Sequence, residues 1–163
     1  MVIGLACSGK TTIARQLGEI LNLPVFHMDK IICQENWVKA PDVSFEHAQQ
    51  QILNKENWIY EGFNPSTLSK QVESADRIIY LNKSHVVIIF NYLKRLIQHR
   101  DRARASMPEG NVEHFSFSYI KWLWKYKNQD IIDKVLEYAK GKPVVILSTS
   151  QEVRDYTRSI NLG

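Results

Sequence analysis

Short runs of apolar residues alternate along the chain with segments whose apolar residues recur every three or four positions. Such apolar runs are typical of strands in a parallel sheet buried on both faces, and the longer spacing indicates helices between them. Right-handed connections would produce a three-layer α/β/α domain. The five expected strands are 2–4, 25–28, 58–60, 77–81 and 144–147, and the expected helices are 10–21, 44–55, 84–105, 116–139 and 151–160, with a short helix from about residue 65.

Length and charge limit the organisation of the chain. Its 163 residues are the size of one domain, so we expect a single domain over 1–163. Residues 107–111 break the helical pattern, and we expect a lid over about 100–118. The net charge of +4 suits an anionic partner without choosing among phosphorylated small molecules, nucleotides and nucleic acids.

The sequence offers no sign of a membrane or a secretory route. The longest apolar run near mid-chain, residues 86–90, is far shorter than the roughly 20 residues that cross a bilayer. No basic residue precedes the apolar start, and Cys7 and Cys33 are too few for a disulfide framework. We therefore expect a cytoplasmic protein without a membrane partner.

The segment 4–11, GLACSGKT, matches the phosphate-loop pattern G-x-x-x-x-G-K-[ST] between a strand and a helix. Its glycines let main-chain amides approach phosphate oxygens, and the helix N-terminus adds positive potential. Lys10 is expected to reach the β- and γ-phosphates of ATP, and the Thr11 hydroxyl to ligate Mg²⁺. A helix N-terminus can lower the pKa of a thiol such as Cys7, but a small residue at a variable position is the favoured interpretation. The expected nucleotide contacts are Gly4, Ala6, Cys7, Ser8, Gly9, Lys10, Thr11 and Thr12.

Two carboxylates follow expected strands. Asp29 comes after the run 25–28, and Glu61 after the run 58–60. The carboxyl ends of parallel strands meet at the edge where the phosphate loop lies. We expect Asp29 to be the base or, with Thr11, a Mg²⁺ ligand, and Glu61 to assist, and the sequence leaves open which carboxylate is the base.

A basic stretch precedes the expected lid and consists of Lys94, Arg95, His99, Arg100, Arg102 and Arg104. Arg100 and Arg104 are four residues apart and would share a helix face, from which they would neutralise a phosphate in transfer. The alternatives are a solvated helix face and a nucleic-acid surface. The nearby aromatic residues 115–124 favour core packing under the lid over base stacking.

Taken in order, several segments resemble the bacterial DNA topology modulation protein family, which is similar to adenylate, shikimate and gluconate kinases. They are the loop 4–11, His27-Met28-Asp29-Lys30 with Trp37, the segment 58–62, the basic stretch with residues 107–110, and residues 150–153. The resemblance implies a P-loop fold of the nucleoside- and shikimate-kinase type with sheet order 2-3-1-4-5 and ATP as nucleotide. It also implies a metal or acceptor role for Asp29 and adenine contacts within 148–151, including Ser150. Ser66 stands where the family pattern would have an arginine.

The leading hypothesis is therefore an ATP- and Mg²⁺-dependent kinase whose catalytic residues are Lys10, Asp29, Glu61, Arg100 and Arg104. The alternative is a nucleotide-dependent regulator that binds DNA through the basic stretch, which is the less favoured partner. A slow nucleoside triphosphatase without an acceptor is a third, weaker hypothesis. The sequence identifies neither the acceptor nor the oligomeric state.

Overall fold

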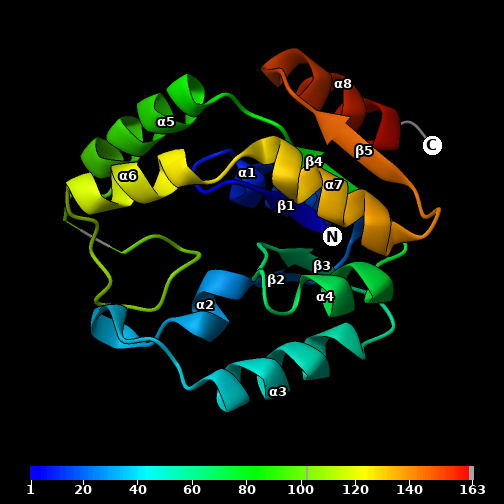
Figure 1. Ribbon diagram of the computed structural model, residues 1–163, viewed down its shortest axis with the longest axis horizontal. Coiled ribbons are helices and arrows are strands. Elements are labelled where there is room, and N and C mark those ends of the chain that lie inside the picture. The colour runs from blue at the N-terminus through cyan, green and yellow to red at the C-terminus, as the bar shows by residue number, and fades with distance from the viewer. Residues whose placement is uncertain (102, 162–163) are drawn as a thin grey trace.

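The computed structural model describes residues 1–101 and 103–161 and contains one parallel five-stranded sheet with helices on both faces (Figure 1). Arg102 of the predicted basic stretch lies outside the described residues. The strands are β1 Val2–Gly4, β2 Val25–His27, β3 Ile59–Glu61, β4 Ile78–Leu81 and β5 Val144–Leu147. The helices are α1 Lys10–Leu21, α2 Met28–Ile32, α3 Asp42–Leu53, α4 Leu68–Ser74, α5 His85–Gln98, α6 Phe117–Lys125, α7 Asn128–Ala139 and α8 Ser150–Asn161, with a 3₁₀ turn at Glu35–Trp37.

The strand order is β2-β3-β1-β4-β5, as the resemblance implied. β1 lies at the centre, paired with β3 on one side and β4 on the other. The order reverses direction at β1, so the loop that follows β1 opens at the position where ligands bind in open α/β sheets.

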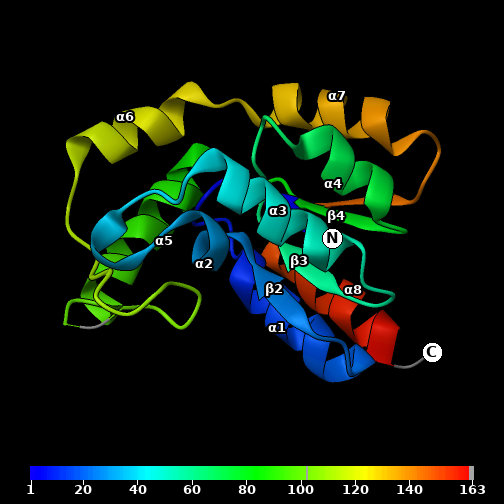
Figure 2. The ribbon, with the colours of Figure 1, turned by 90° about the horizontal axis from the view of Figure 1, so that it is seen from below.

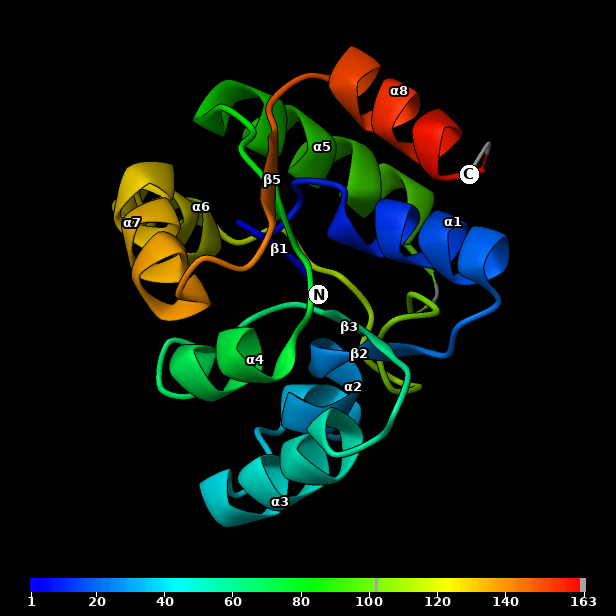
Figure 3. The ribbon, with the colours of Figure 1, turned by 90° about the vertical axis from the view of Figure 1, so that its right-hand side faces the viewer.

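Alternate residues of the strands pack into two separate hydrophobic cores, one on each face of the sheet. Val2, Ile79 and Leu81 pack with α1 and α8 on one face. Ile3, Ile78 and Tyr80 pack with α4 and α7 on the other face, where Ile88 of α5 and Leu123 of α6 join them. Figure 3 shows α1 and α8 on one side of the strands and α4 and α7 on the other, and Figure 2 shows α3 beside the β2 edge. The alternation confirms a sheet buried on both faces.

Two predicted helices are wrong in extent. The helix predicted over 84–105 ends at Gln98, so the described residues 99–101 and 103–116 form the connecting segment between α5 and α6. The helix predicted over 116–139 is two helices, because Tyr126 and Lys127 have extended backbone, and Asn128 starts α7 with its side chain bonded to the sheet end. Its Oδ1 accepts from the Tyr80 hydroxyl at 2.8 Å and its Nδ2 donates to Lys83 O at 2.8 Å.

The structure also adds local detail that periodicity did not predict. α2 begins directly after β2, so Asp29 lies in the first turn of a short helix and not in a loop. α4 starts at Leu68, after a turn in which Asn64 Oδ1 accepts from the Ser66 amide. Among the described residues, no helix combines the length and apolar character needed to cross a membrane.

Candidate active site

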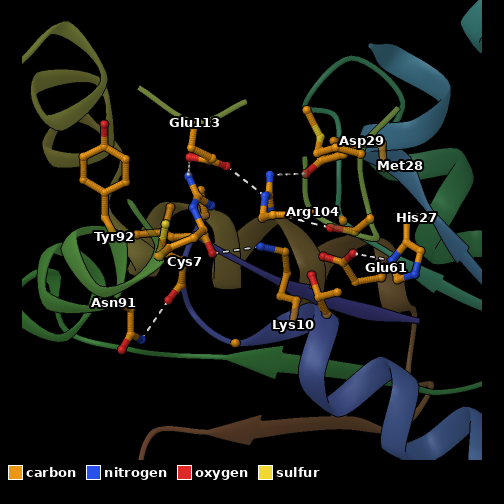
Figure 4. A pocket seen from close by; sticks show the side chains of 18 of the residues that line it. Cys7, Lys10, His27, Met28, Asp29, Glu61, Asn91, Tyr92, Arg104 and Glu113 are labelled. Atoms are coloured by element: carbon orange, nitrogen blue, oxygen red, sulfur yellow. Dashed lines mark hydrogen bonds and ion pairs between the residues drawn. The ribbon is translucent and has the colours of Figure 1, made fainter. Parts of the chain in front are cut away.

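A cavity of about 1240 Å³ lies at the carboxyl end of the sheet. Its walls come from the loop after β1, the ends of β2 and β3, α5, the connecting segment and α6. Two groups of side chains face it, as Figure 4 shows. We call residues 4–12 with His27 and Glu61 the loop end, and Asp29, Arg95, Arg104 and Glu113 the arginine end.

The loop end has the tight backbone that phosphate binding requires. Gly4, Cys7 and Gly9 have φ angles of 149°, 60° and 98°, and a left-handed φ is unusual for a cysteine. A Cβ at Gly4 would lie 2.7 Å from the carbonyl oxygen of Leu81, so only glycine fits there. The Asn91 side chain of α5 holds this shape by donating to Cys7 O at 2.9 Å.

Polar groups of the loop remain available to an anion. Within the described residues, no protein acceptor is found for the amides of Cys7, Gly9 and Lys10, all of which line the cavity. The Lys10 ammonium donates to Leu5 O at 2.9 Å, an acceptor that phosphate oxygens can replace. Amides, an ammonium group and the N-terminus of α1 together form an anion site.

Two loop residues contribute less than their place in the motif predicts. Ser8 is buried and does not line the cavity. Its amide donates to Leu5 O and is therefore not available to a phosphate. Burial raises the pKa of the Cys7 thiol, an effect that outweighs the nearby charges of Arg95 and Lys10. The thiol is therefore neutral at neutral pH, which agrees with the interpretation of Cys7 as a small residue of the loop.

Glu61 and His27 form a buried pair beside Thr11. Glu61 Oε2 and His27 Nδ1 are 2.9 Å apart, and the Glu61 side chain is 6% exposed. Burial by itself raises the pKa of Glu61, but the hydrogen bond with His27, the charge of Lys10 and the hydrogen bond with Thr11 hold it below its usual value. Glu61 is thus an anion at neutral pH that orients its neighbours.

The arginine end centres on a buried carboxylate. Glu113 is 4% exposed, and its two oxygens lie 2.8 Å from Arg95 Nη2 and 2.8 Å from Arg104 Nε. Arg104 Nη2 also lies 3.5 Å from Asp29 Oδ2, and the Asp29 side chain is 39% exposed. Asp29 is therefore the accessible carboxylate of the cavity, and its ion pair with Arg104 of the connecting segment orients it.

The structure brings most of the predicted site residues into one cavity, but not all. Asp29, Glu61 and Arg104 line it, together with every predicted loop contact except Ser8. Arg100 is exposed and does not line the cavity, and the predicted helix face shared by Arg100 and Arg104 is wrong because α5 ends at Gln98. Ser150 begins α8 and does not line the cavity either.

Several residues of the site were not singled out from sequence. Asn91 was not predicted, and Arg95 was predicted only as part of the basic stretch. The two are four residues apart on α5, so a polar stripe on an otherwise apolar helix was a usable signal. Glu113 and the fully buried Asn111 gave no signal, since their partners lie in other segments.

Aromatic rings line the cavity near α5 and α6. The rings of Tyr92, Tyr119, Trp122 and Tyr126 follow one another at centroid distances of 5.0, 5.6 and 4.9 Å. The prediction that aromatic residues 115–124 pack as a core is wrong for Phe115, Phe117 and Trp124, which are 52%, 73% and 58% exposed.

The residues present are compatible with Mg²⁺ bound together with a nucleotide. Within residues 1–101 and 103–161, no group of three or more His, Cys, Asp and Glu side chains could hold a metal ion by itself. The Thr11 hydroxyl and the Glu61 carboxylate both line the cavity, and they are the kind of oxygen ligands that Mg²⁺ prefers when phosphates and water complete its shell.

The sheet order and the loop after β1 define a P-loop nucleoside-triphosphatase fold of the shikimate-kinase type. No protein-family model matches the chain, and no curated protein sequence matches it.

Solved structures of the same fold are kinases at low sequence identity. Shikimate kinase from Acinetobacter baumannii is 15% identical with a TM-score of 0.58, covering 98% of this chain and 88% of its own. A gluconokinase from Sinorhizobium meliloti 1021 is 18% identical with a TM-score of 0.55, covering 99% and 87%. Deoxyadenosine kinase from M. mycoides with bound dCTP is 14% identical with a TM-score of 0.50, covering 100% of both chains.

Proposed function

We propose that this protein is a Mg²⁺- and ATP-dependent phosphotransferase that acts on a small-molecule alcohol. The observation that carries the proposal is one cavity that holds both a phosphate-type loop with available amides and an accessible carboxylate beside an arginine. Transfer of a phosphoryl group needs these elements within reach of each other. The proteins of similar fold are named as kinases, which supports the same function.

The loop end would bind the nucleotide. The loop amides and Lys10 would hold the β- and γ-phosphates of ATP. Thr11 and Glu61 would hold Mg²⁺, which when bound neutralises charge on the phosphates. The lowered pKa of Glu61 keeps its carboxylate charged and so favours this supporting role over that of a base. A direct Mg²⁺ contact by Asp29, and adenine contacts by Ser150, stay predictions from sequence.

The arginine end would act on the acceptor. The acceptor hydroxyl oxygen attacks the γ-phosphorus and forms the new P–O bond, while the bond from that phosphorus to the β,γ-bridging oxygen breaks and ADP leaves. The proton of the hydroxyl passes to the Asp29 carboxylate, which is the accessible base. Arg104 and Arg95, oriented by Glu113, stabilise the charge on the phosphoryl oxygens during transfer.

Thermal unfolding with and without Mg²⁺–ATP tests the proposal. A nucleotide at 100 times its Kd should add about 2.7 kcal/mol of stability and raise Tm by several degrees. Lys10→Ala should remove the shift, while Lys134→Ala, an exposed lysine of α7, should leave it unchanged. An unchanged Tm of the wild-type protein with Mg²⁺–ATP contradicts nucleotide binding.

A second candidate function is binding of single-stranded nucleic acid, which would also suit a DNA topology modulation protein. Arg95 and Arg104 of the basic stretch are paired inside the cavity, which leaves the exposed Lys94 and Arg100 as its surface charges among the described residues. The observation in favour is α6, where exposed Phe117 and Trp124 lie near exposed Lys121 and Lys125. A fluorescent oligonucleotide should bind at low salt and be released as salt rises. Absence of binding at low salt excludes this function.

A further inference from the structure

A tryptophan is held at the cavity in a conformation that it would not adopt unaided. Trp37 lines the cavity with 46% of its surface exposed, and its φ is 60°, directly after Asn36 at 57°. Left-handed conformations at bulky residues cost free energy and persist only where surrounding contacts enforce them. An exposed indole in such a position is unusual for a residue that only fills space.

Contacts from the connecting segment enforce this conformation. The Trp37 amide donates to Asn111 Oδ1 at 2.7 Å, and its indole Nε1 donates to Val112 O at 3.1 Å. Asn111 is fully buried, and its Nδ2 donates to Gln34 O at 2.9 Å. Both N–H groups of Trp37 therefore have hydrogen-bond acceptors. The flat faces of its indole ring are left as apolar surface at the cavity.

A second aromatic surface comes from a different part of the fold. Trp122 of α6 lines the cavity and is 45% exposed. Its ring is stacked on Tyr119 with an interplanar angle of 14° and a centroid distance of 5.6 Å. In Figure 1, α6 and the α2–α3 connection that carries Trp37 lie on different sides of the molecule, and the cavity is lined by both. Such surfaces suit a planar ring.

The charges of the arginine end are already compensated. Arg95 and Arg104 carry two positive charges, and Glu113 and Asp29 carry two negative ones within contact distance. The four charges sum to zero, so the arginine end has no excess positive charge with which to bind a carboxylate or phosphate of the acceptor in addition to the phosphoryl group in transfer. A neutral acceptor leaves this pairing intact, and breaking a buried charge pair is costly.

Building on the proposed kinase function, we infer that the acceptor is an alcohol that carries a planar, uncharged aromatic ring, the chemistry of a nucleoside. Trp37 and Trp122 contact the ring and determine specificity, and the hydroxyl is directed toward Asp29. This selects against anionic acceptors such as nucleoside monophosphates and sugar acids.

The test measures ADP formation from Mg²⁺–ATP with separate acceptors: purine and pyrimidine nucleosides, simple aryl alcohols, the matching nucleoside monophosphates, gluconate and shikimate. The inference requires turnover with a neutral ring-bearing alcohol and at least tenfold lower kcat/KM with its monophosphate. Turnover only with gluconate, shikimate or a monophosphate overturns it. If ATP still raises Tm but none of the acceptors is turned over, the inference about the acceptor is overturned as well. If ATP does not raise Tm, the proposed kinase function itself fails.

Tryptophan variants make the assignment specific. Trp37→Ala and Trp122→Ala should each raise the KM for the acceptor about tenfold, the size of one base-stacking contact, with the KM for ATP unchanged. Trp124→Ala is the matched control, because Trp124 lies on the same helix and does not line the cavity. Equal effects of Trp122→Ala and Trp124→Ala would contradict a ring contact at Trp122. Trp122→Phe should restore most of the affinity.

Discussion

Most of the loop end of the cavity is formed by the consecutive residues 4–12, to which His27 and Glu61 are added from the ends of β2 and β3, whereas the whole arginine end is assembled from side chains far apart in the sequence. Residues 4–11 leave β1, turn and enter α1 in a single pass of the chain. The arginine end combines Asp29 of α2, Arg95 of α5, and Arg104 and Glu113 of the connecting segment. In the proposed function, the local motif would bind the nucleotide, and the long-range contacts would shape the site of the acceptor.

The two ends also differ in how they support folding. At the loop end, Lys10 makes a single hydrogen bond to a nearby carbonyl, so its charge is kept for a ligand. At the arginine end, a buried carboxylate holds two mostly buried guanidinium groups and ties the connecting segment to α5. Substitution of Lys10 at the loop end should therefore weaken ligand binding more than it lowers the unfolding free energy. Substitutions at the arginine end should lower the unfolding free energy as well.

The largest expected effect is that of Glu113→Ala. Removing the carboxylate leaves Arg95 and Arg104 buried without their shared partner, which should cost about 3–5 kcal/mol of unfolding free energy. Lys10→Ala should cost about 1 kcal/mol or less, because it removes one hydrogen bond. Urea unfolding of the three proteins measures the difference.

Glu109→Ala is the control, since Glu109 is an exposed acid of the same segment and its loss changes the net charge equally. If Glu113→Ala and Glu109→Ala unfold at the same urea concentration, the buried ion pairs do not stabilise the arginine end. The contrast between the two ends then disappears.

A smaller effect is expected from Asn111→Ala. The substitution removes the hydrogen bonds to the Trp37 amide and to Gln34 O, and leaves both backbone groups without these partners. A loss of about 1–3 kcal/mol follows from two part-buried hydrogen bonds. Hydrogen exchange at the Trp37 amide should accelerate strongly, while the protection of the α1 amides should fall only in line with global stability.

The exposed Asn57→Ala serves as the control for the loss of an asparagine side chain. Unchanged protection of the Trp37 amide in the Asn111→Ala variant would show that residues 34–37 hold their conformation without the connecting segment. Trp37 would then belong to a locally encoded part of the cavity, like the loop end.

The same contrast explains what the sequence could predict. The phosphate-loop pattern, the apolar strands and α1 are local, and all of them were predicted within a few residues. Sheet order came from the resemblance and is confirmed by the pairing of β1 with β3 and β4. Asp29 and Glu61 were predictable because strand ends meet at one edge of a parallel sheet.

Sequence reasoning failed where tertiary contacts decide the conformation. No glycine or proline marks the end of α5 at Gln98. Residues 103–116 are not helical, and they make contacts that only the folded chain offers, such as Asn111 with Gln34. The helical spacing of Arg100 and Arg104 was therefore misleading. Glu113 is one acid among many in the sequence, and only its burial between two arginines distinguishes it.

The smallest effect concerns a carboxylate of the loop end and depends on pH. The pKa of Glu61 in the folded protein is below its usual value of 4.5, so the unfolded state takes up a proton first as pH falls. The contribution of the ionised Glu61 is fully present above pH 4.5 and is lost as pH falls below it toward the lower pKa of the folded state. Glu61→Gln should therefore lower the unfolding free energy by about 1–2 kcal/mol at pH 7 and by less at pH 3.

Urea unfolding of wild type and Glu61→Gln across pH 3–7 measures this convergence, with the exposed Glu56→Gln as the matched control that should run parallel to wild type. A constant gap between wild type and Glu61→Gln at every pH would mean that the carboxylate is not stabilised by His27 and Thr11. Glu61 would then lose its role as a charged anchor. Convergence of the two proteins toward pH 3 would confirm that the ionised Glu61 stabilises the folded state.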